Sequence, residues 1–285
     1  MANATTFTQK ALKLSAAALL LLAGSAAQAI TIDSDISDWI KAPKGKASDW
    51  NKTLRSSISV VVEDQHKWYL NPGYGGQKYD AEAMYVELVG SMLNIGIATG
   101  RAPHAKGWAA GDIALNFDFG SDATSFEYGI VTRDHNGMSQ GDVYSVDNWN
   151  YGLWVKPKKT SSAMNTYKLS HPTSIKSGDL LGSVDLAYGE MTHGSMNFGD
   201  SKPDKIGKYK KDRHYMIETS VDLALLNLGS LNDFDLRVHW TANCNNDWIQ
   251  LDMQHAQVPE PASLVLLAIG LIGFASRKRL RRKQA

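Results

Sequence analysis

Apolar residues at every second position are the feature that most restricts how this chain can fold. Two segments show the pattern over their whole length: Phe234, Leu236, Val238 and Trp240 in residues 234–241, and Ile113, Leu115, Phe117 and Phe119 in residues 112–119. Successive side chains of a β-strand point to opposite faces, so each segment presents one apolar face and one more polar face. Apolar faces of this kind are buried when two sheets pack against each other. The pattern therefore predicts a β-structure in two layers.

Further strand candidates follow at intervals of roughly ten residues, separated by Gly, Asn and Asp, which favour turns. Gly90 and Ser91 join two of them into a predicted hairpin. The helix candidate in this part of the chain is residues 222–227, with Ser220 as its cap. The spacing predicts an all-β fold with a single β-sandwich domain over residues 30–258. The additional strand candidates are residues 58–63, 83–89, 92–99, 126–132, 143–146, 151–155 and 215–221.

The charge of the chain is unevenly distributed. The formal net charge is +1, with 30 Lys and Arg against 29 Asp and Glu. Two of the basic residues lie before residue 30 and six lie after residue 276, so residues 30–258 carry a net charge of about −6. A protein that binds nucleic acid needs a basic face, so this composition argues against a nucleic-acid partner. Cys244 is the single cysteine, which excludes an intrachain disulfide, and we expect it to be buried.

The first 29 residues have the three parts of a signal peptide. Two lysines form a basic segment, and residues 14–24 form an apolar segment that is too short to span a bilayer comfortably. Ala27 and Ala29 then place small residues at both positions that signal peptidase reads. Cleavage after Ala29 would leave Ile30 as the first residue of the mature protein.

An apolar segment followed by a basic cluster stands near the other terminus. Residues 262–276 are uncharged and mostly apolar. A helix of that length extends about 22 Å, against about 30 Å for the hydrocarbon core, and local thinning of the bilayer can supply the difference. We therefore expect a transmembrane helix, with the basic tail of residues 277–283 in the cytoplasm and the body of the protein outside. The basic residues of this tail are Arg277, Lys278, Arg279, Arg281, Arg282 and Lys283.

Pro259, Glu260 and Pro261 come directly before the apolar segment. Two prolines keep the backbone extended and outside the following helix, which suits a site that a protease cuts. The Pro-Glu-Pro, the apolar segment and the Arg-rich end, residues 259–285, together resemble the PEP-CTERM sorting signal of Gram-negative bacteria. The resemblance implies processing near Pro-Glu-Pro by an exosortase, after a transient stay in the inner membrane. It also implies a cell-surface or extracellular destination, often in organisms that make exopolysaccharide.

A second resemblance concerns the body of the chain. Residues 32–39, Ile-Asp-Ser-Asp-Ile-Ser-Asp-Trp, are similar to the opening of sandwich domains akin to family 9 carbohydrate-binding modules and DOMON domains. Residues 79–86 and 93–100 resemble their first hairpin, and residues 239–247 resemble a closing strand. Ser34 stands where those domains often carry Gly. The resemblance implies a jelly-roll-like sandwich that often binds sugar and sometimes holds structural calcium.

Aromatic residues beside Asn and Asp are the most suggestive chemical signal in the body. A sugar offers apolar C–H faces to rings and hydroxyl groups to polar side chains, so the combination suits carbohydrate. Packing between the sheets is the alternative for such rings, and we expect it for Trp39, Trp154 and Trp240. The candidate sugar-binding residues are Trp68, Tyr69, Trp149, Tyr151 and Trp154.

Candidate metal ligands are Asp112, Asp118 and Asp122, since the first two share one face of a strand and the third lies in the turn after it. Carboxylates suit calcium, so a structural calcium ion is the only cofactor that the sequence suggests. Asp33 and Asp35 are interpreted as turn residues rather than as a catalytic pair. The eight histidines match no metal-ligand spacing, and we expect them at the surface.

Known catalytic motifs are missing from the sequence: it has no nucleophile elbow, P-loop or zinc-protease motif. No pair of carboxylates can be nominated for glycoside cleavage. We therefore expect a non-enzymatic protein that is exported, processed by signal peptidase and an exosortase, and associated with exopolysaccharide. Two alternatives stay open: a hydrolase or lyase that acts on that polysaccharide, and a purely structural matrix protein without a small ligand.

Overall fold

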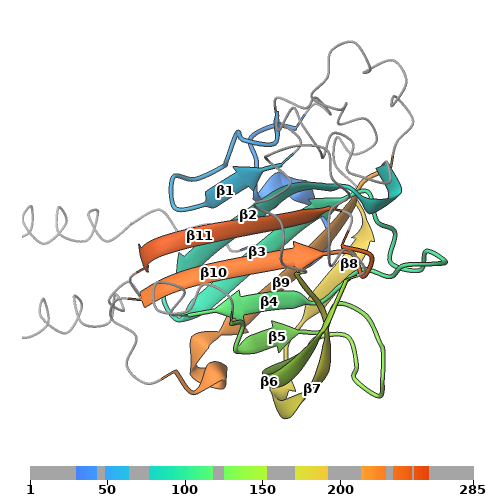
Figure 1. The fold of residues 1–285 in the computed structure, drawn as a ribbon. Coiled ribbons are helices and arrows are strands. Elements are labelled where there is room, and N and C mark those ends of the chain that lie inside the picture. Colours follow the sequence, from blue (N-terminus) through green and yellow to red (C-terminus); the bar gives the residue numbers. More distant parts are fainter. Residues whose placement is uncertain are drawn as a thin grey trace, which may run out of the picture. The chain divides into compact units, whose positions relative to one another are not determined.

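The computed structural model describes residues 30–43, 49–63, 77–117, 125–152, 171–191, 213–228, 234–245 and 247–256. These residues form two antiparallel sheets (Figure 1). The five-stranded sheet has the order β1 (Ser59–Val62), β2 (Ala81–Val89), β3 (Met92–Thr99), β9 (Tyr215–Asp222) and β8 (Leu186–Glu190). The six-stranded sheet has the order β11 (Trp248–Ala256), β10 (Phe234–Thr241), β4 (Ile113–Asn116), β5 (Tyr128–Ile130), β6 (Asp142–Tyr151) and β7 (Pro172–Ser183). Short 3-10 helices in the described part are η1 (Ile36–Asp38), η3 (Gln77–Tyr79) and η5 (Leu223–Leu226).

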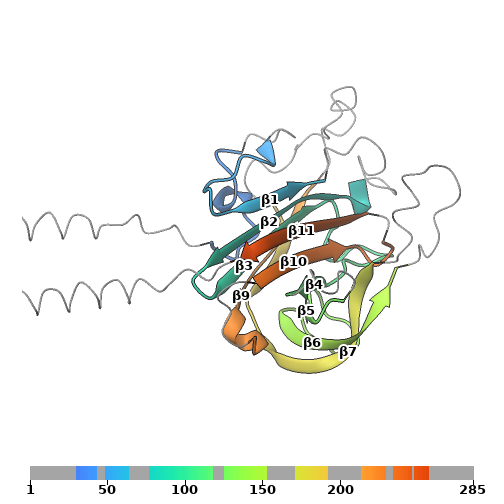
Figure 2. The same cartoon turned by 60° about the vertical axis from the view of Figure 1, so that its left-hand side comes forward.

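The hydrophobic core lies between the two sheets, which face each other in Figures 1 and 2. β3 contributes Leu93, Ile95 and Ile97, all fully buried at alternate positions. Burial of one such side chain contributes about 1.5–3 kcal/mol, so these alternating faces hold the layers together. The predicted all-β sandwich is thus confirmed for the described residues. The opposing core residues are the ones that the alternation predicts: Ile113, Leu115, Phe117, Phe234, Leu236, Val238 and Trp240.

The predicted hairpin is confirmed. β2 and β3 pair up to Val89 and Met92, and Gly90 in the turn has a φ of 58°, a conformation that glycine adopts without steric cost. The sequence also predicts separate strands at residues 143–146 and 151–155. This division is wrong for the described part, because β6 continues from Asp142 to Tyr151. The second half of β6 has no fully buried residue and mixes Asp and Asn with two aromatic residues, so no continuous apolar alternation joins it to the first half.

Three strands, β7, β8 and β11, have no counterpart among the predicted elements. The larger parts of β7 and β8 are partly or fully exposed, β7 is largely polar in that part, and β8 is only five residues long, so neither shows a clear apolar alternation. The helix candidate is the 3-10 helix η5, and the expected cap at Ser220 is wrong. Asp222 caps it instead, since its carboxylate accepts the amide N–H of Ala224 over 3.0 Å. Ser220 donates its hydroxyl to Asn94.

Several predictions concern parts of the chain beyond these ranges. The signal peptide, residues 1–29, and the transmembrane helix, residues 262–276, lie outside the described residues. Within the described ranges, no helix is long and apolar enough to cross a membrane. Cys244 is buried, as expected, and so are Trp39 and Trp240.

Candidate functional site

Two of the five predicted sugar-binding aromatics, Trp149 and Tyr151, lie on β6. Tyr151 is 57% exposed at the end of the strand, whereas Trp149 is partly buried. Trp68, Tyr69 and Trp154 lie outside the described residues. Among the described candidates, Tyr151 is therefore the ring that is open to a ligand from solvent.

Trp149 packs closely against its own sheet. A Cβ atom placed on Gly129 would lie 2.7 Å from Cη2 of Trp149 and 2.8 Å from Cδ1 of Ile175, so the bare glycine makes room for both side chains. The indole N–H of Trp149 donates to the carbonyl oxygen of Phe126 over 2.8 Å. Trp149 thus belongs to a small hydrophobic cluster with Val131 and Ile175. This contact gives the ring a packing role in the sheet.

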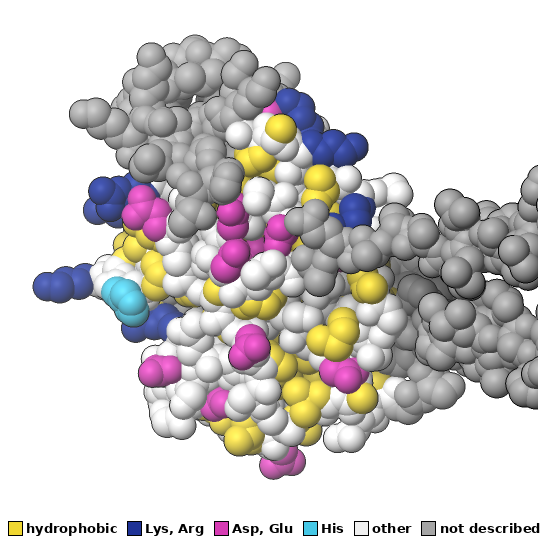
Figure 3. Space-filling view, turned by 180° about the vertical axis from the view of Figure 1, so that it is seen from behind, with side chains coloured by type: hydrophobic (Ala, Val, Ile, Leu, Met, Phe, Trp, Pro, Cys, Tyr) yellow, Lys and Arg dark blue, Asp and Glu magenta, His cyan; other side chains and the backbone are white. Residues whose placement is uncertain are grey.

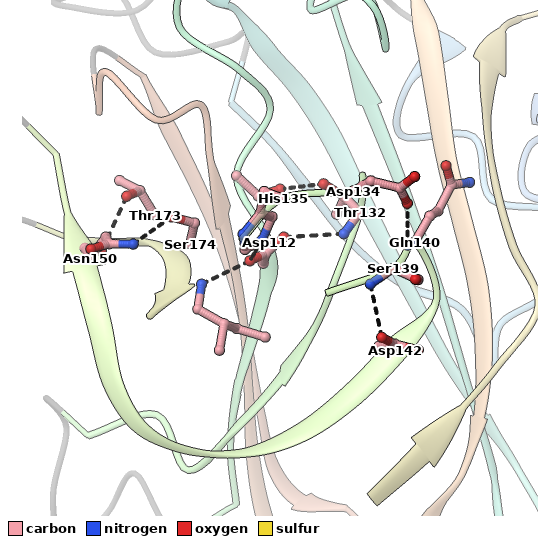
Figure 4. Close-up of polar contacts among 12 residues, drawn as sticks. Asp112, Thr132, Asp134, His135, Ser139, Gln140, Asp142, Asn150, Thr173 and Ser174 are labelled. Atoms are coloured by element: carbon pink, nitrogen blue, oxygen red, sulfur yellow. Dashed lines mark hydrogen bonds and ion pairs between the residues drawn. The ribbon is translucent and has the colours of Figure 1, made fainter. Parts of the chain in front are cut away.

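Polar side chains of β6 and β7 pair across the two strands in the half of β6 that ends at Tyr151. Asn148 donates its amide to the hydroxyl oxygen of Ser177 over 3.0 Å. Asn150 donates to Ser174 over 3.1 Å, as Figure 4 shows. Register shifts interrupt the pairing of β6 with β7 in this region, so side chains do not alternate regularly between the faces. We call Asn148, Asn150, Tyr151, Ser174 and Ser177 the β6–β7 strip. It contains one exposed ring, Tyr151, together with two amide and two hydroxyl side chains, of which Ser174 is buried.

Asp112 lies at the start of β4 and is only 1% exposed. Figure 4 shows its carboxylate at the centre of a group of polar contacts. One oxygen accepts the amide N–H of Thr132 over 3.1 Å, and the other accepts the amide N–H of Ile175 over 2.8 Å. The second oxygen also lies 2.8 Å from Nε2 of His135. Asp112 therefore ties β4 to β7 and to the turn around residues 133–138.

The hydrogen bond with Asp112 raises the pKa of His135 above its ordinary value, although burial acts in the opposite direction. Both oxygens of Asp112 already accept hydrogen bonds from protein donors. A calcium ion at this carboxylate would compete with those donors. Asp118 and Asp122, its predicted partners, lie outside the described residues, so the calcium site that combines the three stays a prediction.

The expectation that the histidines lie at the surface is wrong for His214 and His239, which are 1% and 0% exposed. His239 points to the face of β10 opposite the sandwich core, where His171 stacks on it with ring centroids 4.9 Å apart. The ring of Trp248 stacks on that of His171, with ring centroids 4.6 Å apart. Burial lowers the pKa of His171 to about 4, and burial also lowers the pKa of His239 well below its ordinary value. Both rings are therefore neutral packing groups near neutral pH.

The backbone at Ser34 explains why glycine is favoured at this position of the motif at residues 32–39. Ser34 has a φ of 69°, in the left-handed region where residues with a side chain are strained. Asp33 accepts the amide N–H of Asp35 over 2.9 Å, and Asp35 in turn accepts that of Ser37 at the start of η1. The interpretation of Asp33 and Asp35 as turn residues is thus confirmed.

Charged side chains are unevenly spread over the surface. Figure 3 shows a face on which Asp and Glu lie over the centre and lower part, while Lys and Arg lie towards the upper and left margins. This arrangement agrees with the acidic charge of the body.

The comparison with known proteins concerns the C-terminal segment. The family model described as the PEP-CTERM protein-sorting motif matches residues 257–282. The chain carries a PEP-CTERM sorting signal. This PEP-CTERM signal marks an exported protein that depends on an exosortase and passes through the membrane on its way to the cell surface. No curated protein and no solved structure matched the chain.

The predicted processing residues lie around this PEP-CTERM signal and at the other terminus. Ile30 begins the described residues, directly after the predicted signal-peptidase site at Ala27 and Ala29. The Pro-Glu-Pro at residues 259–261 and the basic tail at residues 277–283 lie outside the described residues. The match to residues 257–282 includes the Pro-Glu-Pro, the whole apolar segment and most of the basic tail.

Proposed function

We propose that this protein is a non-enzymatic component of the cell surface or extracellular matrix that associates with exopolysaccharide. The match of residues 257–282 to the PEP-CTERM motif carries the proposal, because that motif directs a protein to this destination. The two-sheet domain is the part that would be delivered. The lack of recognisable catalytic motifs in the sequence supports a binding role over an enzymatic one.

Two cleavages define the proposed route. Signal peptidase removes residues 1–29 after Ala29, and the body then crosses the inner membrane. Residues 262–276 hold the chain there, with the basic tail inside, until an exosortase cuts near Pro259. Ala27 and Ala29 support the first cleavage, the apolar segment and its basic flank support the retention in the membrane, and Pro-Glu-Pro supports the second cleavage.

The β6–β7 strip is the proposed contact with polysaccharide. Its exposed ring, Tyr151, lies on the same strand as Asn148 and Asn150, and a ring together with amides suits the apolar face and the hydroxyls of a sugar. Trp149, which lies between Asn148 and Asn150 in β6, packs on Gly129 and so holds this part of the strand on the sheet. Single contacts of this kind are weak, so the proposed binding depends on many copies along one polymer.

Retention on the exopolysaccharide of the host organism tests this proposal. Tyr151→Ala should lower retention roughly fivefold, as expected for a contact of about 1 kcal/mol. Leu180→Ala is the matched control, since Leu180 is an exposed apolar side chain of β7 (56%) outside the strip. Equal retention of the two variants would contradict the role of the strip. Release of new reducing ends from the polymer would favour the hydrolase or lyase alternative, and no retention at all would favour the purely structural one.

A further inference from the structure

Three buried carboxylates meet where the two sheets come together at one side of the sandwich. Glu63 follows β1, Asp80 precedes β2 and Asp247 precedes β11. They are 5%, 2% and 0% exposed, and one oxygen from each lies within 4.8 Å of the others. β1 and β2 belong to the five-stranded sheet and β11 to the six-stranded sheet, and β11 lies beside β2 in both ribbon views (Figures 1 and 2). The cluster therefore spans both layers.

Asp247 is the member that joins the sheets. Its Oδ2 accepts the amide N–H of Ala81, the first residue of β2, over 2.6 Å. Its Oδ1 is fully buried and has no hydrogen-bond donor among the residues that the structure describes. The carboxyl group of Asp247 also lies within hydrogen-bonding reach of that of Asp80. A buried carboxylate oxygen without a donor is costly, so this position calls for a proton or a cation.

The charges of the three carboxylates also favour a proton or a cation at this position. Three negative charges within a few ångströms of each other are unfavourable in a protein interior unless a positive charge compensates them. Two groups sharing one proton would reduce this cost in part. A divalent cation would neutralise two of the three charges.

The geometry and chemistry of the ligands favour calcium among such cations. Calcium–oxygen bonds are about 2.3–2.6 Å long, so two oxygens on opposite sides of one ion are about 4.6–5.2 Å apart. Ligand atoms that all lie within 4.8 Å can thus contact a single ion. An all-carboxylate set suits hard cations and lacks the nitrogen or sulfur ligands that zinc prefers. Calcium also tolerates irregular geometry better than magnesium.

We propose that Glu63, Asp80 and Asp247 bind a calcium ion that holds the two sheets together at the β1–β2–β11 side. These three ligands are different residues from Asp112, Asp118 and Asp122, for which the sequence predicts a calcium site. Calcium sites of extracellular modules have dissociation constants of about 10⁻⁴–10⁻³ M, which matches the exported destination of this protein. The ion acts as a structural clamp that forms after export, when calcium becomes abundant.

Calorimetric titration of the full chain in detergent, stripped of metal with a chelator, tests the site. Calcium chloride should bind at one ion per chain, and 10 mM calcium should raise Tm by roughly 5 °C, with a smaller rise from magnesium. Asp247→Asn should weaken calcium binding at least tenfold. Asp252→Asn is the matched control, because Asp252 is an exposed carboxylate on the same strand and should leave the affinity unchanged. Asp118→Asn should also leave it unchanged.

Three results would overturn the proposal. The first is a wild-type chain that shows neither heat nor a change in Tm with 10 mM calcium, which would leave the carboxylates to share a proton. The second is unchanged calcium affinity in Asp247→Asn. The third is loss of binding in Asp118→Asn alone, which would place the ion at the other site. If Asp247→Asn fails to fold, Glu63→Gln carries the same test, with the same tenfold weakening expected.

Discussion

Trp39 donates its indole N–H to the carboxylate of Glu218 over 2.6 Å, and both side chains are fully buried. The other carboxylate oxygen of Glu218 accepts the amide N–H groups of Asp33 and Ser34. One side chain of β9 thus holds the first described segment and η1 on the five-stranded sheet. The strained φ of Ser34 is compensated in part by the hydrogen bond that its amide donates.

Glu218 should give the protein a distinctive dependence on pH. Burial raises its pKa to about 7, and the neighbouring Asp33 adds to this, although the hydrogen bonds from Trp39 and the two amides act in the opposite direction. A carboxyl group with a raised pKa holds its proton more firmly in the folded state. Its contribution is therefore present below about pH 4.5 and is lost as the pH rises through about 7.

Urea denaturation between pH 4.5 and 8 checks this expectation. The wild type should lose about 1–3 kcal/mol relative to Glu218→Gln over that range, at about 1.4 kcal/mol for each unit of pKa difference. Glu190→Gln on the neighbouring strand β8 is the control, because its exposed carboxylate should leave the slope unchanged. The explanation fails if Glu218→Gln follows the wild-type slope.

Gly129→Ala should destabilise the protein by about 1–3 kcal/mol, because the new Cβ would lie 2.7 Å from Trp149 and 2.8 Å from Ile175. Thermal or chemical denaturation measures the loss. Trp149→Leu in the same chain should recover part of it, so the double variant would cost less than the two single variants together. Tyr151→Ala, on an exposed ring, should change stability by no more than about 0.5 kcal/mol. If the losses in unfolding free energy of Gly129→Ala and Trp149→Leu simply add in the double variant, Trp149 does not pack on Gly129.

Asp112→Asn should cost about 2–3 kcal/mol, because an amide cannot accept all the donors that the carboxylate accepts. The same variant should lower the pKa of His135 towards its ordinary value, which NMR titration of the imidazole measures. Asp142→Asn serves as the comparison, since Asp142 accepts the Ser139 amide at the surface and should cost less than about 1 kcal/mol. A His135 pKa that does not move in Asp112→Asn would refute the coupling of the two groups.

The strands that could be predicted from the sequence are those with one buried and one more polar face. β4 and β10 alternate because their apolar residues fill the core, and Gly90 marks the turn between β2 and β3. β7 escapes prediction because residues 176–183 are largely exposed, which leaves no apolar period. β11 does alternate, with Ile249 and Leu251 in the core, but over too short a stretch to stand out.

The candidate sites were less predictable than the strands, for a physical reason. Glu63, Asp80 and Asp247 are far apart in the sequence, and only the pairing of strands across two sheets brings them together. In the sequence, His239 occupies a polar position of the alternating strand β10. In the structure, the rings of Phe126 and His171, which come from other segments, lie against it. Trp149 is a plausible sugar platform by composition, but the missing side chain of Gly129 turns it into a packing residue.

The intact mass of the mature protein, isolated from its own host, tests the central claim of export and processing most directly. The expected mass lacks residues 1–29 and ends near Pro259, without the apolar segment and the basic tail. A chain with Pro259, Glu260 and Pro261 replaced by Ala should instead keep its tail and stay in the membrane fraction. A mature wild-type species that still contains residues 277–283 would contradict the account.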